Sequence, residues 1–488
     1  MIKNANTQGL FAGYQSHPFF CEFLSRHPAS HPQLQRLFNT LNTMDGTLLA
    51  TRARDMHHEL YQQGITFALY SGNESSDRVL PFDMIPRIIM ASEWQRLEAG
   101  IVQRVRALNL FLHDIYHHQR ILKDNILPAR LVLGNNHFRK EMQGIEVPGG
   151  VYVHICGIDL IRDEAGIFRV LEDNARIPSG VSYVVKNRRT MLRLFPDVVS
   201  RIDIHAVEEY GQNLRVALSE VAPAMLSGNG LRIVLLSPGM YNSAYFEHVF
   251  LAQEMGVPLV EGRDLTVQDD TVYMRTTSGL ERVDVIYRRV DDDFIDPEVF
   301  NPTSTLGVAG IMRAYRKGRV TIANAIGTGV ADDKAVYAYM PRIIKYYLGE
   351  DALLPNVETF ICAEKEALAY TLEHMRELVV KPVGESGGYG MIIGPTASNK
   401  QIEDFRDKLK ANPANYISQP VMKLSVCPTL IGEGIEPRHV DLRPFVITGN
   451  KSWVLPGGLT RVALEKGSLV VNSSQGGGSK DTWVLRHE

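Results

Sequence analysis

The sequence predicts an α/β protein of several domains, with α+β elements outside its parallel sheet. Three observations support this fold class. Apolar strands alternate with helices between residues 231 and 287, two apolar strands flank a glycine-rich loop near residue 385, and two strands near residue 165 carry acidic residues. With 488 residues, 44% of them hydrophobic, the chain is long enough for roughly two to four packed domains.

The composition argues against several classes of partner. Lysine and arginine total 52 and aspartate and glutamate 55, and this balance gives no electrostatic case for nucleic acid or an anionic membrane. No apolar run approaches the roughly 18 residues of a membrane-spanning helix, and the start MIKNANTQG has no signal-peptide pattern. The four cysteines are scattered without C-x-x-C spacing, which predicts a reduced cytoplasmic protein with neither a zinc site nor a disulfide framework.

The N-terminal part is weakly patterned, with helices predicted at 32–42 and 49–63. A long amphipathic helix follows, with Ser92 as its candidate N-cap and apolar residues at three- and four-residue steps from 94 to 115. His113, His117 and His118 lie near its end and could suggest a metal. They lack acidic company in the sequence, so we interpret them as surface histidines.

The segment 159–182, DLIRDEAGIFRVLEDNARIPSGVS, predicts a hairpin with a loop attached. A period-2 strand places Phe168, Val170, Glu172 and Asn174 on one face. A turn at 163–166 would place Asp159 opposite Val170 and diagonal to Glu172, on that same face.

Asp159, Glu172 and Asn174 would then converge as two carboxylates and one amide, which suit Mg²⁺. The alternative is a solvent-facing hairpin with ordinary surface acids. Alternation of the acids with bulky apolar residues, and the adjoining ARIPSG, favour the metal site.

Two stretches in the second half predict phosphate contacts. The apolar strand 378–382 contains Lys381 and leads into the glycine-rich loop 384–390, where backbone N–H groups can approach phosphate oxygens closely. The alternative is a flexible hairpin tip. Lys334 begins a helix predicted to run towards Tyr347, and a lysine there opposes the helix dipole, which indicates an anion nearby. The sequence has neither a P-loop motif nor a G-x-G-x-x-G that opens a helix.

Together these segments resemble the ATP-grasp carboxylate–amine ligases. The run around Glu172 resembles the D…G…(L/V)E-x-N-x-R/P-x-G segment that closes that superfamily. Its place in the first half of this chain implies a circularly permuted ATP-grasp fold. LAQEMGVPLVEGRDL with VDVIYRR, and the later DLRPFV, resemble segments of glutathione synthetase-like and glutathionylspermidine synthetase-like ligases.

The resemblance implies four regions. They are a mostly helical N-terminal region at 1–120, the metal and substrate half of the ATP-grasp core at 121–204, an inserted parallel-sheet substrate domain at 205–325, and the nucleotide-binding lobe with the central strands at 326–488.

The resemblance also implies roles for individual residues. ATP would contact Lys334, Lys381, Gly384, Ser386, Gly387, Gly388, Tyr416 and Gln419. Lys381 and Arg461 would be catalytic, and the substrate would contact Arg176, Ser179, Ser182, Arg288 and Arg289. For the paired arginines at 288 and 289, a buried salt bridge to the acids at 291–293 is an equal alternative.

The implied function is an ATP- and Mg²⁺-dependent ligase that joins a small-molecule carboxylate to an amine or peptide through an acyl phosphate. One alternative is an ATP-grasp kinase that stops after phosphorylating a small acceptor. The other is a nucleotide-binding scaffold without turnover.

Overall fold

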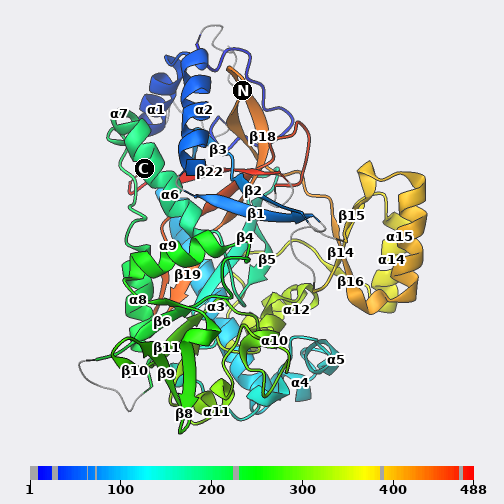
Figure 1. Ribbon diagram of the computed structural model, residues 1–488. Coiled ribbons are helices and arrows are strands. Elements are labelled where there is room, and N and C mark those ends of the chain that lie inside the picture. Colours follow the sequence, from blue (N-terminus) through cyan, green and yellow to red (C-terminus); the bar gives the residue numbers. More distant parts are fainter. Residues whose placement is uncertain are drawn as a thin grey trace.

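A computed structural model describes residues 9–24, 31–62, 64–71, 74–223, 230–384, 390–471 and 476–487, without the side chains of 66–71 and 74–78. Within these residues a nine-stranded sheet forms the centre of the molecule, in the order β20-β19-β4-β18-β21-β22-β3, with β5 paired to β4 and β17 to β18 (Figure 1). Its strands are β3 (Phe82–Ile89), β4 (Ile155–Arg162), β5 (Phe168–Asn174), β17 (Val426–Ile431), β18 (Gly434–Arg443), β19 (Phe445–Thr448), β20 (Ser452–Val454), β21 (Leu459–Val462) and β22 (Gly478–Val484).

The N-terminal region contributes strands as well as helices. The predicted helices are present as α1 (Pro32–Asn42), α2 (Gly46–Gln62) and α3 (Ala91–Tyr116), although α3 begins after Met90 and not at Ser92. The hairpin β1 (Thr66–Ser71) and β2 (Glu74–Val79) was not predicted. Neither was β3, which pairs in parallel with β22 and so joins the first hundred residues to the last strand.

The region 205–325 contains the predicted parallel sheet, in the order β12-β11-β6-β7. Its elements are β6 (Ile233–Leu236), α9 (Tyr245–Met255), β7 (Leu259–Val260), β11 (Val285–Arg288) and β12 (Thr321–Ala323). An antiparallel sheet of β8 (Leu265–Gln268), β9 (Thr271–Thr276) and β10 (Gly279–Arg282) interrupts it and was not predicted.

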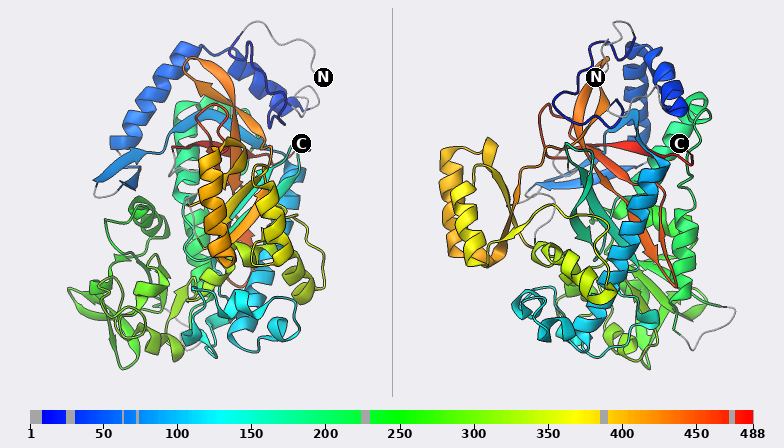
Figure 2. Two further views of the ribbon diagram at one scale, coloured as in Figure 1. Left: turned by 90° about the vertical axis from the view of Figure 1, so that its right-hand side faces the viewer. Right: turned by 180° about the vertical axis from the view of Figure 1, so that it is seen from behind.

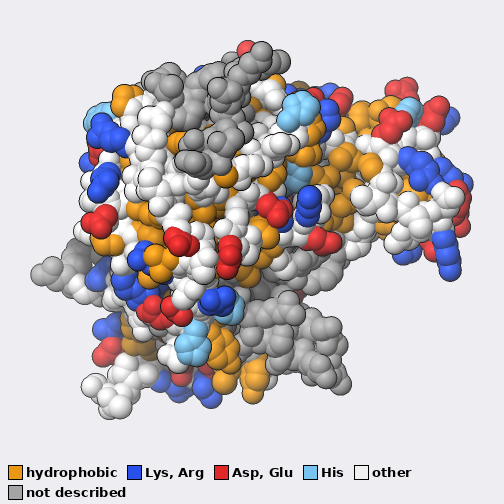
Figure 3. Space-filling model, turned by 90° about the horizontal axis from the view of Figure 1, so that it is seen from above, with side chains coloured by type: hydrophobic (Ala, Val, Ile, Leu, Met, Phe, Trp, Pro, Cys, Tyr) orange, Lys and Arg blue, Asp and Glu red, His pale blue; other side chains and the backbone are white. Residues whose placement is uncertain are grey.

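A small lobe stands to one side of the body (Figures 1 and 2). Its sheet has the order β13-β16-β14-β15, with β13 (Phe360–Ile361), β14 (Leu378–Pro382), β15 (Ile392–Ile393) and β16 (Tyr416–Pro420), and its helices are α14 (Lys365–His374) and α15 (Asn399–Ala411). Val380 packs with Ile402 and Phe405 of α15, and a capping box of Ser398 and Gln401 begins that helix. Seen from above, the lobe carries charges of both signs at its outer end and hydrophobic side chains where it meets the body (Figure 3).

Proline interrupts the regular structure at two places. The helix expected from Lys334 to Tyr347 is split into α12 (Lys334–Ala338) and α13 (Met340–Leu348), with Pro341 in the first turn of the second helix. Pro444 separates β18 from β19 in the segment DLRPFV. Proline lacks the N–H that a helix interior or a central ladder uses, so both interruptions have a local cause.

The remaining helices lie between these sheets or cover them. They are α4 (Arg120–Lys123), α5 (Ala129–Leu133), α6 (Val181–Leu194), α7 (Pro196–Val199), α8 (Tyr210–Glu220), α10 (Asp292–Ile295) and α11 (Ile311–Arg316). None of the helices in the described part of the chain combines the length and apolar character needed to cross a membrane.

Candidate active site

A cleft lies between the lobe and the central sheet, and four adjacent strands of the sheet supply its charged floor. In the strand register, Asp159 of β4 lies opposite Glu172 of β5, and Asp441 of β18 lies opposite Arg461 of β21. Residues directly opposite each other in an antiparallel pair share a face. The register therefore gathers these four side chains on the cleft side of the sheet.

A bulge in the hairpin changes the predicted register. Leu160 pairs with Val170 and Asp159 with Glu172, so Leu171 is the extra residue on β5. Val170 is buried in the core, whereas Leu171 and Glu172 both line the cleft. The prediction that Asp159 lies opposite Val170, and that Val170 shares the face of Glu172, is therefore wrong.

The three predicted metal ligands nevertheless lie together. Asn174 Nδ2 donates to Asp159 Oδ1 at 3.4 Å, and Asn174 and Glu172 line the same small cavity at the edge of the cleft. Asp173 points to the opposite side, where it accepts hydrogen bonds from Arg104 Nε at 2.5 Å and Nη2 at 2.7 Å. This buried ion pair with Arg104 of α3 holds β5 on the side away from Asp159.

Two arginines hold the buried carboxylate of Asp159. Arg443 Nη2 donates to Asp159 Oδ2 at 2.8 Å, and Arg461 Nη2 donates to the same oxygen at 2.5 Å. Burial opposes ionisation of Asp159, but the two guanidinium groups outweigh it and hold its pKa below the ordinary value. Burial raises the pKa of Asp441, which also accepts from Arg461 Nε at 3.0 Å. Asp159 is thus the carboxylate kept ionised at the floor of the cleft.

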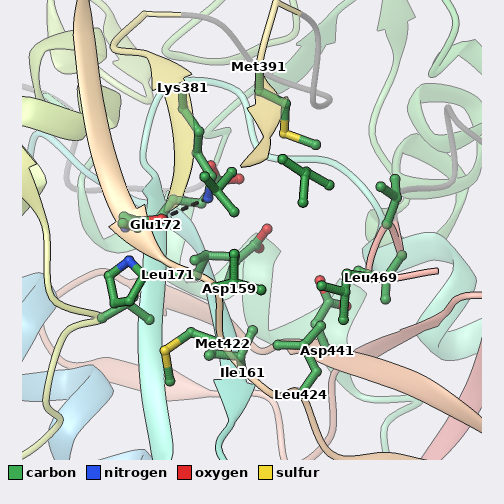
Figure 4. Close-up of a pocket in the computed structure, with 18 of the residues that line it drawn as sticks. Asp159, Ile161, Leu171, Glu172, Lys381, Met391, Met422, Leu424, Asp441 and Leu469 are labelled. Carbon is green, nitrogen blue, oxygen red and sulfur yellow. Dashed lines mark hydrogen bonds between the residues drawn. The ribbon is translucent and has the colours of Figure 1, made fainter. Parts of the chain in front are cut away.

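Lysines face these acids from both sides of the cleft. Lys381 alternates with Val380 along β14, so its side chain leaves the lobe on the cleft side, towards Asp159 and Glu172 (Figure 4). Lys381 Nζ donates to Gln419 Oε1 at 2.8 Å, and burial lowers the pKa of Lys381 to about 8. Lys334 Nζ lies 3.7 Å from Glu172 Oε2.

The rest of the cleft is apolar, and sequence reasoning missed most of it. Its walls come from alternate positions of several strands and from the segment after β16 (Figure 4), and they include Ile161, Leu171, Val379, Met391, Ile393, Val421, Met422, Leu424, Leu469 and Val471. The alternation was the available signal, but it did not show which face of each strand would meet the lobe. A cleft with apolar walls, a charged floor and two lysines suits a nucleoside triphosphate.

The predicted nucleotide contacts divide into three groups. Gln419 lines the cleft with Lys334 and Lys381, and Gly384 lines the adjoining small cavity. The Tyr416 ring instead packs edge-on against Phe405 of α15, so it faces the helices of the lobe and not the cleft. Ser386, Gly387 and Gly388 lie outside the described residues.

Two of the predicted substrate residues lie near the cleft. Arg176 lines the small cavity and pairs through Nη1 with Asp291 Oδ2 at 2.9 Å. The carbonyl oxygen of Ser179 accepts from Arg443 Nη1 at 3.2 Å, which ties the loop 175–180 to the floor of the site.

The other three predicted substrate residues contact protein groups. Ser182 is buried, and its Oγ donates to Glu247 Oε2 at 2.9 Å. Arg288 is fully buried and pairs with Asp292 at 2.6 Å, which is the salt-bridge alternative. Arg289 donates to the carbonyl oxygen of Pro178 at 2.6 Å and pairs with Glu247, not with the acids at 291–293. Ser182 and Arg289 thus hold the loop 175–182, whereas Arg288 donates to the carbonyl oxygens of Val290, Asn324 and Ala325.

A cleft between a small β lobe and a central, mostly antiparallel sheet, with a lysine from the lobe facing carboxylates of the sheet, is the arrangement of the ATP-grasp class. The chain belongs to the circularly permuted ATP-grasp type 2 family, whose family model matches residues 86–463. The predicted family and its circular permutation are confirmed.

Relatives and a solved structure agree with this assignment. An uncharacterized protein of Synechocystis sp. is 52% identical over 474 residues, 97% of this chain and 98% of its own length. A candidate glutamate–cysteine ligase of Frankia casuarinae is 41% identical over 466 residues, which cover 95% of this chain but only 53% of the Frankia protein. A glutathione synthetase-like effector from Globodera pallida has the same fold, with a TM-score of 0.57, 10% identity, and coverage of 91% of this chain and 98% of the effector.

Proposed function

We propose that the protein is an ATP- and Mg²⁺-dependent ligase that joins a carboxylate to an amine through an acyl phosphate. The observation that carries this proposal is the meeting of Lys334 and Lys381 with Asp159 and Glu172 in a cleft with apolar walls. The apolar walls would take the base of the nucleotide, and the charged floor and the two lysines its triphosphate.

The donor set fits Mg²⁺. Asp159, Glu172 and Asn174 offer hard oxygen atoms on neighbouring strands, and Asp159 stays ionised despite its burial. Bound there, Mg²⁺ would neutralise charge on the phosphates of ATP.

The chain's own residues then bind and orient the reactants. The nucleophile is an oxygen of the substrate carboxylate, so the protein does not need a nucleophilic side chain. Lys381 and Lys334 hold phosphate oxygens as point charges, and Arg461, already held by Asp159 and Asp441, presents a fixed guanidinium to the anionic acyl phosphate. Losing one such contact typically costs about 10²- to 10³-fold in rate.

The substrate would enter beside the small cavity lined by His137, Arg176 and Asp332. Burial raises the pKa of Asp332 to about 7, although Arg176 opposes this shift. Arg176 lines this cavity, so Arg176 and the loop 175–180 that contains it are our candidates for contacts with the carboxylate substrate. Ser182 and Arg289 would act only by holding that loop, and Arg288 only by its buried contacts with residues 290–325.

The name of the Frankia relative supports the reaction type, since a glutamate–cysteine ligase joins a carboxylate to an amine. Because this chain spans about half of that relative, the identity of its acid and amine is not transferred. The four buried cysteines are free, which fits the reducing cytoplasmic location that we also propose.

The test is a screen of carboxylates and amines for ADP release, with coupled products identified by mass spectrometry. A ligase requires both an acid and an amine. ADP release with a single acceptor would indicate the kinase, and ATP binding without turnover would indicate the scaffold. The Lys381→Met variant should lose turnover, whereas Lys423→Met is the matched control, because Lys423 is exposed and pairs with Glu164 at 2.8 Å.

A further inference from the structure

Two histidines and a glutamate meet at the end of α3, away from the cleft. His113 and His117 are four residues apart on one helix face, and their rings stack with centroids 4.2 Å apart. Glu146 comes from the segment between the short turns Lys140–Met142 and Pro148–Gly150, and its Oε1 lies 3.2 Å from His117 Nε2. One ligand atom from each of the three side chains lies within 4.8 Å of the others.

The tautomer of His117 is fixed by its surroundings. His117 Nδ1 lies 2.8 Å from the carbonyl oxygen of His113, and a carbonyl can only accept, so Nδ1 donates. In the neutral ring, Nε2 then carries a lone pair. The His117 side chain is only 9% exposed, and its buried Nε2 has no hydrogen-bond partner.

Two acceptors therefore face each other, the lone pair of His117 Nε2 and the carboxylate of Glu146. Either a proton or a cation must lie between them to make the contact favourable. Ligands bound to one tetrahedral Zn²⁺ at its usual bond lengths are about 3.4 Å apart, close to the observed separation of 3.2 Å. A backbone carbonyl on the other ring nitrogen is also the usual support for a metal-binding histidine.

We propose that His113, His117 and Glu146 bind one Zn²⁺, with water in the fourth position. Two imidazole nitrogens and one carboxylate oxygen are a common zinc donor set. The ion would tie the end of α3 to the segment that leads into β4, the strand that carries Asp159. The sequence argued against zinc because its cysteines are scattered and its histidines at 113–118 lack acidic neighbours in the sequence. The fold supplies the acid from Glu146, 29 residues beyond His117.

The test uses the full chain freed of metal with a chelator and then titrated with Zn²⁺ in excess Mg²⁺, which fills the carboxylates of the cleft. We expect one Zn²⁺ per chain that is lost in the variant of both histidines, His113→Ala with His117→Ala. Glu146→Gln should weaken binding at least about 10-fold. Since Glu146 is 80% exposed, this variant should fold normally.

His118→Ala is the matched control, because the His118 ring is tilted and 6.4 Å from that of His117. The His118→Ala variant should bind Zn²⁺ with the affinity of the wild type. Co²⁺ in place of Zn²⁺ should give the strong visible absorption of a four-coordinate ion in the wild type and not in the double-histidine variant. Equal Zn²⁺ affinity of the wild type and Glu146→Gln, or an equal loss in His118→Ala, would overturn the proposal.

Discussion

The affinity of the cleft for ATP should fall as the pH rises through 8, because Lys381 loses its proton there. Burial lowers the pKa of Lys381 to about 8, with Glu172 opposing the shift and Lys334 adding to it. Such a lysine is about 90% protonated at pH 7 and about 10% protonated at pH 9. If only the ammonium form holds the triphosphate, the dissociation constant rises about 10-fold over this range, or about 1.4 kcal/mol.

The measurement is calorimetric titration with ATP at saturating Mg²⁺ and constant ionic strength between pH 6.5 and 9.5. The terminal phosphate loses its last proton near pH 6, so the ligand does not titrate over most of this range. Lys381→Arg keeps its charge at every pH used and should give a flat profile. A flat wild-type profile, or the wild-type slope in Lys381→Arg, would refute the assignment of this titration to Lys381.

Three further perturbations test separate parts of the site. Glu172→Gln should abolish Mg-ATP turnover without changing the circular dichroism spectrum or thermal melt, and unchanged turnover would remove the metal assignment. Arg104→Met should lower the free energy of unfolding in urea by about 3–5 kcal/mol, because it leaves Asp173 buried without its ion pair. Arg106→Met on the same helix should lower the free energy of unfolding by less than about 1 kcal/mol, since Arg106 is 65% exposed. An equal loss of stability in Arg104→Met and Arg106→Met would contradict this reasoning. Met422→Ala should weaken ATP binding about 5- to 10-fold but leave tripolyphosphate binding unchanged, because only ATP has a base to contact the apolar wall. An equal loss of affinity for both ligands would place the base elsewhere.

Elements defined by local patterns could be predicted from the sequence. The strand Leu378–Pro382 was predicted with its observed ends because apolar residues end at a glycine-rich loop. The parallel sheet followed from alternating strands and helices. In each case the signal lies in the pattern of one continuous segment of chain.

The floor of the site could not be predicted in this way. Asp159 is held by Arg443, which lies 284 residues further along the chain, and Arg461 is held by Asp441 through strand pairing. DLRPFV matched a family motif, yet nothing in the sequence showed that its arginine would contact Asp159. Contacts between distant strands depend on the sheet order, which the local pattern does not contain.

The hairpin nevertheless contained a signal for its bulge. Strict alternation from Phe168 puts Val170 and Glu172 on one face of the strand. Val170 and Leu171, however, are both large and apolar and directly precede the acid Glu172. This pattern indicates that the face that contacts the core up to Val170 faces the cleft from Glu172 on. A one-residue change of register moves every following side chain to the opposite face. The extra Leu171 makes that change, since Val170 is buried in the core and Asp173 pairs with Arg104 of α3, while Leu171 and Glu172 line the cleft. In this hairpin Glu172 is in phase with the buried Val170 and still lies in the cleft, because the bulge at Leu171 separates them.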